Sequence, residues 1–377
     1  MDGNTMGMAA VRHRTEADTA DVGKQIVPVD PRCPAVYSPP SIDADLDPSQ
    51  MIHEVRMRLV RRLIHVAFLG SSFLLLGHAQ ISRLAPGDQP DFDIQYVGGD
   101  KPLPRWENGY VLTFEHEPEN APLVSVFSSQ GSKVFSTSLA LDGVVKFQIR
   151  SIAASSKGVF AVSGGALDSS GSGANVIVYL DSTGAVTQVV RLKDFAGTQL
   201  CFAEDNRLWV AGRDRSKPGP PADHDIIRVY DDKGIFQKSF LRRSLFSTDR
   251  HPAVGLSHIA ANRQNVALFS SETGYLIVMS KGGDVLSIRH VPLAPERWVT
   301  GLALSGASEA VISSFAHYGM TEQITFHILA ADASRWTEIY SQGSPNNRYS
   351  KLYGFSGENL LVGSYHPFKF SWVRIQR

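Results

Sequence analysis

Cysteine is almost absent from this chain. The 377 residues include two, Cys33 and Cys201, too few for the disulfide framework of a small secreted domain or for a cysteine-based zinc site. Cys201 lies in the run TQLCFAED, which we interpret as a strand. We expect its side chain to be a small buried hydrophobe rather than a nucleophile.

Excess charge of either sign is also missing. Lys and Arg together number 37, as do Asp and Glu, so the formal net charge is zero. A nucleic-acid-binding protein normally needs a basic face to neutralise phosphates. We therefore expect no nucleic-acid partner.

The chain lacks an apolar run that would span a membrane comfortably. The run Leu63–Gly77 has 15 residues, which at ~1.5 Å per residue is shorter than a hydrocarbon core of ~30 Å. An arginine cluster precedes this run and Gly77-His78-Ala79 follows it, which is the layout of a secretory signal. We predict that residues 51–79 are a signal peptide cleaved after Ala79, giving a secreted or periplasmic protein that meets the membrane only through this segment. The alternative is a protein anchored by an uncleaved signal.

Residues 1–50 show no apolar periodicity and are rich in Pro and Asp. We interpret them as a disordered or mis-annotated extension, with translation starting at Met51 or Met57. The alternative is a cytoplasmic tail in front of an anchoring helix. The folded domain is expected at residues 80–377.

Motifs that bind nucleotides or build known catalytic centres are missing. Neither a phosphate-binding glycine loop nor a G-x-S-x-G elbow occurs, and the carboxylate sets of a calcium loop are lacking. We expect no cofactor, and no catalytic residue can be assigned.

What the chain does have is a repeat. A turn residue followed by a short apolar run occurs six times, and the first residues are 49, 49, 58, 44 and 50 positions apart. The copies are GYVLTF from Gly109, GVFAVSG from Gly158, RLWVAG from Arg207, NVALFSS from Asn265, EAVISSF from Glu309 and NLLVGSY from Asn359. A propeller blade of four strands takes ~40 to 50 residues.

Each copy is flanked by further strand-like runs. A short run precedes it, and a hairpin follows in which turns such as Asp181–Gly184 and Asp231–Gly234 supply Asp and Gly. Each unit therefore has four strands. We predict an all-β fold, a six-bladed β-propeller of four-stranded antiparallel blades, because stacked units bury apolar faces that one unit cannot bury alone.

The last unit, ending with FKFSWVRIQ, lacks a fourth strand. We predict that the spare strand DFDIQYV, residues 91–97, completes it and closes the ring, leaving no open sheet edge. The alternative is that this strand begins the first unit.

On these repeats and Asp-x-x-Gly turns, residues 91–377 resemble six-bladed propellers of the NHL and TolB-like secreted bacterial kinds. The resemblance implies the architecture and not a family, since the Trp-Asp pairs of WD40 repeats and the paired glycines of kelch repeats are missing.

The loops between the second and third strands are where we expect a ligand face. Equivalent positions there hold the candidates His116, Arg213, Asp214, Glu272, His317, Tyr365 and His366. Imidazole and carboxylate groups converging from several blades could bind a metal or act as general acids and bases; no metal site is assigned, because polar loop residues need no function.

The leading hypothesis is an exported, monomeric binding or scaffold module for a protein or carbohydrate partner, because a rigid ring presents its loops with little loss of entropy on binding. The alternative is a hydrolase or lyase with a His/carboxylate site on the same face. Fold alone does not choose between them.

Overall fold

The computed structural model describes residues 83–94, 104–115, 121–214, 223–245, 256–294, 296–318, 321–340, 351–363 and 369–376. All of them belong to the unit Ala79–Arg377. The predicted signal segment and the extension before it lie outside the described residues. No helix in the described part of the chain has the length and hydropathy of a membrane span.

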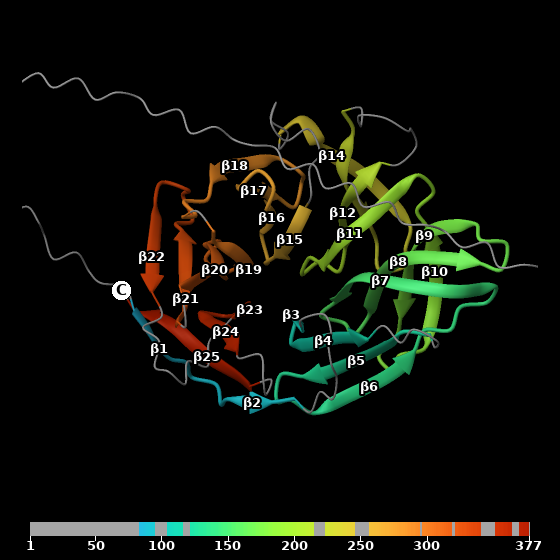
Figure 1. The fold of residues 1–377 in the computed structure, drawn as a ribbon, viewed down its shortest axis with the longest axis horizontal. Coiled ribbons are helices and arrows are strands. Elements are labelled where there is room, and N and C mark those ends of the chain that lie inside the picture. The colour runs from blue at the N-terminus through green and yellow to red at the C-terminus, as the bar shows by residue number, and fades with distance from the viewer. Residues whose placement is uncertain are drawn as a thin grey trace, which may run out of the picture. The chain divides into compact units, whose positions relative to one another are not determined.

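The described residues form six antiparallel sheets arranged as the blades of a propeller (Figure 1). We number the strands of a blade from the centre outward. Blades one to three consist of β3 (Arg105–Glu107), β4 (Tyr110–Glu115), β5 (Leu123–Ser128), β6 (Lys133–Ser138); β7 (Val144–Ala154), β8 (Phe160–Asp168), β9 (Gly173–Leu180), β10 (Val186–Arg191); and β11 (Phe195–Phe202), β12 (Leu208–Asp214), β13 (Asp225–Tyr230), β14 (Phe236–Arg242).

Blades four to six complete the ring, and a short 3-10 helix, η1 (Arg243–Leu245), follows β14. Their strands are β15 (Leu256–Ala261), β16 (Asn265–Ser270), β17 (Tyr275–Ser280), β18 (Val285–His290); β19 (Trp298–Leu304), β20 (Ala310–Tyr318), β21 (Thr321–Leu329), β22 (Trp336–Tyr340); and β23 (Lys351–Ser356), β24 (Asn359–Gly363), β25 (Lys369–Gln376), β1 (Arg83–Pro86). The predicted fold is confirmed, and each predicted repeat motif is the second strand of a blade.

The core lies between blades rather than within them. Six clusters of buried side chains fill the six blade-to-blade interfaces. Successive residues of one strand serve opposite interfaces: Trp209 packs toward blade four and Val210 toward blade two. Both faces of a second strand are therefore buried, which explains why these strands appear in the sequence as nearly continuous apolar runs.

The Asp-x-x-Gly turns form as predicted. Asp181 Oδ1 accepts hydrogen bonds from the backbone N–H groups of Thr183 and Ala185 at 2.8 and 3.0 Å. Gly184 has a φ of 85°, which favours glycine. A Cβ added there would lie 2.6 Å from the ring of Phe135 in the preceding blade, so this turn also fixes the spacing between blades.

An N-terminal strand closes the ring, as expected, but its position differs from the prediction. β1 is the fourth strand of blade six and pairs with β25. Within the described part of the predicted segment 91–97, residues 91–94, the structure has β2 (Phe92–Asp93), which adds two pairs farther along β25. Pro86 has no N–H to donate and ends β1 at an outer edge, where proline is tolerated, and Phe92 resumes the contact by stacking on Phe370 at 5.0 Å.

Candidate functional site

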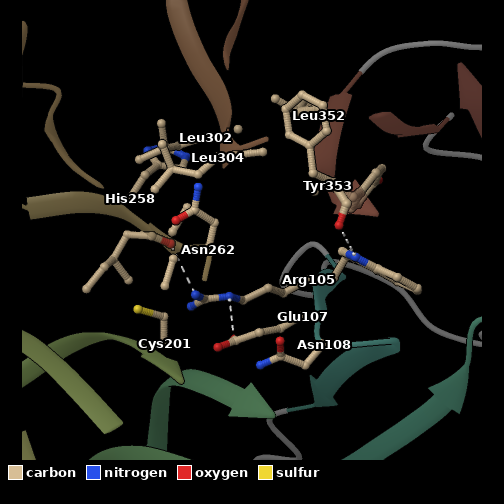
Figure 2. Close-up of a pocket in the computed structure, with 18 of the residues that line it drawn as sticks. Arg105, Glu107, Asn108, Cys201, His258, Asn262, Leu302, Leu304, Leu352 and Tyr353 are labelled. Carbon is tan, nitrogen blue, oxygen red and sulfur yellow. Dashed lines mark hydrogen bonds and ion pairs between the residues drawn. The ribbon is translucent and has the colours of Figure 1, made fainter. Parts of the chain in front are cut away.

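A cavity of about 800 Å³ lies at the centre of the ring. Its walls come from the first strands of all six blades and from the turns that follow them. This volume falls in the range of small-molecule sites, ~300 to 1,000 Å³. Figure 2 shows polar side chains that reach it from several blades.

The direction of the first strands identifies the two ends of the cavity. The first strand of each blade starts on the face that also carries the connections between second and third strands, which we call the loop face. It ends at the turn into the second strand, on the opposite side, which we call the turn face. Lys351 begins its strand toward the loop face, opposite Gly363 at the end of β24, whereas Arg105 lies farther from that face, opposite Leu112 in the middle of β4. Asn108 and Asn262 follow their strands at the turn face.

Arg105 extends across the cavity from blade one. Its Nη2 donates to the carbonyl of Ile259 in blade four at 3.1 Å, and its Nη1 lies 3.4 Å from Ser151 Oγ in blade two. Its Nε lies 3.4 Å from Glu107 Oε2. Figure 2 shows the guanidinium between Glu107 and the strand that carries His258. The guanidinium of Arg105 is thus a positively charged group inside the ring.

Glu107 is buried at the other end of β3, and its Oε1 accepts a hydrogen bond from the backbone N–H of Phe202. Burial raises the pKa of this carboxyl to about 7, although Arg105 and the Phe202 N–H act to lower it. A carboxyl with a pKa near 7 is divided between its two protonation states at neutral pH. It can therefore donate or accept a proton.

Lys351 and His258 also carry perturbed pKa values. Burial, together with the charge of Arg105, lowers the pKa of Lys351 to about 7. Burial and the nearby charges of Lys351 and Arg105 lower the pKa of His258 to about 3, so the imidazole is neutral at physiological pH. The cavity therefore concentrates titratable groups whose burial opposes charge.

Cys201 lines the same cavity as a free, buried thiol. Burial, and then the carboxyl of Glu107, raises the pKa of Cys201 well above its ordinary value. Because the thiolate is the reactive form, this environment agrees with the predicted role of Cys201 as a small buried residue.

Of the seven predicted ligand-face residues, three have described side-chain environments. Arg213 and Asp214 end β12, and Glu272 lies in the turn after β16; all three are on the loop face, with Arg213 and Glu272 exposed. His317 lies in β20, but its side-chain environment is not described, and His116, Tyr365 and His366 lie outside the described residues. Their convergence stays a prediction.

No metal centre is found in the described part of the chain: it contains no group of three or more His, Cys, Asp or Glu side chains that could hold an ion.

A second polar cluster lies within blade five. Ser314 Oγ is 2.8 Å from His327 Nε2, and His327 Nδ1 is 3.2 Å from Glu338 Oε1. This is the order of groups in a serine hydrolase triad. Ser314 is fully buried and Arg297 Nη1 contacts its hydroxyl at 3.3 Å, so a substrate cannot reach it. The cluster joins three strands and is structural.

Sequence reasoning missed the cavity residues. Arg105 and Glu107 belong to a strand of three residues, too short for a periodic pattern. His258 and Lys351 lie in runs that were recognised as strands, but their approach to Arg105 depends on ring closure. The available signal was a charged residue at the start of a run otherwise typical of a buried strand, as in KLYGFS.

Comparison with known proteins assigns the chain to no family. No family model matches the chain, and no curated protein matches it either. A crystal structure of a DUF4221 family member from Bacteroides vulgatus has a TM-score of 0.47 and 10% identity, covering 79% of this chain and 99% of that one. A protein of unknown function from Bacteroides caccae has a TM-score of 0.44 and 13% identity, over 69% and 82%. A luciferin-regenerating enzyme has a TM-score of 0.39 and 11% identity, over 78% and 95%. At this level of similarity no function is transferred.

Proposed function

We propose that this chain is an exported binding protein that takes a small carbohydrate into the central cavity. The observation that carries the proposal is the cavity itself, about 800 Å³, with polar side chains converging from several blades. A narrow concave site suits a sugar better than the surface of a folded protein partner.

The polar lining has a chemical character that fits this ligand. The wall combines charged groups, such as Arg105 and Glu107, with uncharged polar groups, such as Asn108 and Asn262. Sugar hydroxyl groups can form hydrogen bonds with both kinds of group. The blades are also joined by their own apolar interfaces.

Binding is tested by calorimetric titration of the mature protein with glucose, galactose, N-acetylglucosamine, glucuronate and galacturonate. A variant that narrows the cavity is Gly306→Trp, because the nearest atom to a Cβ added at this lining glycine is Gly357 O, at 3.6 Å. Lys146→Trp, at an exposed position of β7, is the matched control.

We expect at least one sugar to bind, and Gly306→Trp to weaken its binding tenfold or more while Lys146→Trp has no effect. Binding that survives Gly306→Trp but is lost in His116→Ala or His366→Ala would move the site to the loop face, where a protein partner is the better candidate. No binding by any probe would overturn the proposal.

A hydrolase or lyase is the second candidate function. It is favoured by the pKa values near 7 of Glu107 and Lys351, which suit proton transfer at neutral pH. The test is hydrolysis or elimination of an oligogalacturonide by the mature protein. Turnover that Glu107→Gln abolishes without unfolding the protein would favour the enzyme, and turnover unchanged in that variant would exclude Glu107 as its acid or base.

Export is a separate part of the proposal. We expect the mature protein to begin at Gln80, which N-terminal sequencing of protein recovered from the periplasm or medium would reveal. Recovery of residues 1–79 attached to a cytosolic protein would contradict export.

A further inference from the structure

The first strands of most blades share a β-bulge, and the residue at the bulge differs in the two blades next to blade one. In five blades the first strand makes a β-bulge against the second. In three of them the bulged residue is Ser or Thr, whose hydroxyl donates to a second-strand carbonyl: Thr198 to Ala211 at 3.2 Å, Ser257 to Phe269 at 3.2 Å and Thr300 to Ser313 at 3.4 Å. Blades two and six have Arg150 and Tyr353 at this position instead. Departures from a structural repeat are expected at functional positions.

The departing blades flank blade one, and blades one and six supply cations to the cavity. Arg105 is the first residue of β3 and Lys351 is the first residue of β23, and both line the cavity. Arg150 in the bulge of β7 also lines it, but its Nη1 is held 2.7 Å from Asn175 Oδ1 in the third strand of blade two, so its charged group is directed outward along the blade.

The carboxylates that line the cavity lie nearer its turn-face end, and one of them, Glu107, is paired with Arg105 at 3.4 Å. Among the described lining residues these are Glu107, which ends β3, and Glu204, which lies in the turn after β11. Glu204 Oε2 is 3.5 Å from Arg263 Nε at the turn face. Glu107 is thus paired with Arg105 and Glu204 with Arg263, and no described carboxylate is paired with Lys351.

Lys351 is not neutralised by the described residues. None of their carboxylates lies within 4 Å of its Nζ; its described neighbour is the ring of Tyr353, whose centroid is 5.4 Å away. The lowered pKa of Lys351 agrees with a cation held near Arg105 without a counterion. A bound anion would favour the charged form of Lys351 and interact with Arg105 at the same time.

We propose that the ligand of the cavity carries an oxyanion group, a carboxylate or a phosphate, bound by Lys351 beside Arg105. This inference rests on the proposed binding function and adds the class of ligand: an acidic sugar rather than a neutral one.

The test is calorimetric titration of the mature protein with glucose, glucuronate and glucose 6-phosphate. The acidic sugars are expected to bind at least tenfold more tightly than glucose, and the tighter of the two identifies the preferred anion. Lys351→Met should weaken the binding of the acidic sugars about tenfold and leave the affinity for glucose unchanged. Lys146→Met, which removes an exposed lysine, should change neither.

A stability measurement separates loss of binding from loss of structure. Because burial disfavours the charged form of Lys351, Lys351→Met is expected to raise the Tm of the unliganded protein at pH 6 while weakening acidic-sugar binding. An affinity for glucose equal to the affinities for both glucuronate and glucose 6-phosphate would overturn the anion inference and leave the binding function standing. Failure of all the sugars in the wider panel to bind would overturn both.

Discussion

At the scale of single residues, burial in the cavity disfavours the charged forms of the titratable side chains. For Glu107, burial raises the pKa of the carboxyl to about 7. In the folded state Glu107 binds a proton more tightly than it does in the unfolded chain. The stability that comes from this tighter proton binding is fully present below pH 4.5 and is lost as the pH rises through about 7.

We therefore expect Glu107→Gln to increase the free energy of unfolding at pH 8, by at most ~3 kcal/mol, with little effect at pH 4. Urea denaturation at both pH values measures this difference. Glu107→Ala is the contrasting variant: it leaves the Phe202 N–H without its acceptor and should destabilise the protein at both pH values by ~1 to 3 kcal/mol. An equal increase in the free energy of unfolding of Glu107→Gln at both pH values would contradict the raised pKa of Glu107 as its cause.

His327 provides a second residue-scale prediction, of opposite pH dependence. Burial lowers the pKa of this imidazole below its ordinary value, against the effect of Glu338. Its neutral form is the one that the fold favours, so the associated stability is complete above pH ~6.5 and is lost as the pH falls. His327→Gln should reduce the loss of stability between pH 7 and pH 5. His290→Gln, at an exposed histidine, is the control, and an unchanged pH dependence in His327→Gln would contradict the account.

At the scale of elements, adjacent blades approach so closely that the first strands need glycine at particular positions. Gly301 in β19 is one: an added Cβ would collide with the carbonyl oxygen of Leu352 in blade six. Gly306, in the turn after β19, has room for a Cβ.

Gly301→Ala is expected to lower the free energy of unfolding by ~1 to 3 kcal/mol, because the backbone of β23 must shift. Gly306→Ala is the matched control and should change it by less than ~0.5 kcal/mol. Guanidinium denaturation of the two variants gives the comparison. Equal effects would mean that the blades are not packed as closely as described.

The strands and turns also show which parts of the fold could be predicted from the sequence. Second strands such as β12 were found because both of their faces are buried, which leaves a continuous apolar run. Turns such as Asp181–Gly184 were found because their conformation requires particular residues. β1 was not found, because RLAP is four residues long and its only sign of strand character is the pairing with β25. The cavity residues were missed for a related reason, since their grouping is a property of the closed ring.

At the scale of the whole molecule, ring closure depends on contacts between the two ends of the folded domain. Phe92 stacks on Phe370 and belongs to the cluster between blades six and one, as does Trp372, whose ring lies 5.1 Å from that of Trp106. These contacts join segments far apart in the sequence, and contacts of that kind are slow to form during folding.

Phe92→Ala should lower the free energy of unfolding by ~3 kcal/mol. It should also weaken binding in the cavity, because blade one carries Arg105 and is positioned by this interface. Val134→Ala, at an exposed position of the outer strand β6, is the control. Equilibrium denaturation monitored by circular dichroism gives the stabilities, and a Phe92→Ala protein as stable as the control would contradict closure through this contact.

The most direct test of the central claim is a crystal structure of residues 80–377 grown with glucuronate. Binding in the cavity predicts electron density for the sugar inside the ring, with carboxylate oxygens at ~3 Å from the Arg105 guanidinium and the Lys351 ammonium. Density for the sugar only outside the ring, with the cavity filled by water, would contradict it.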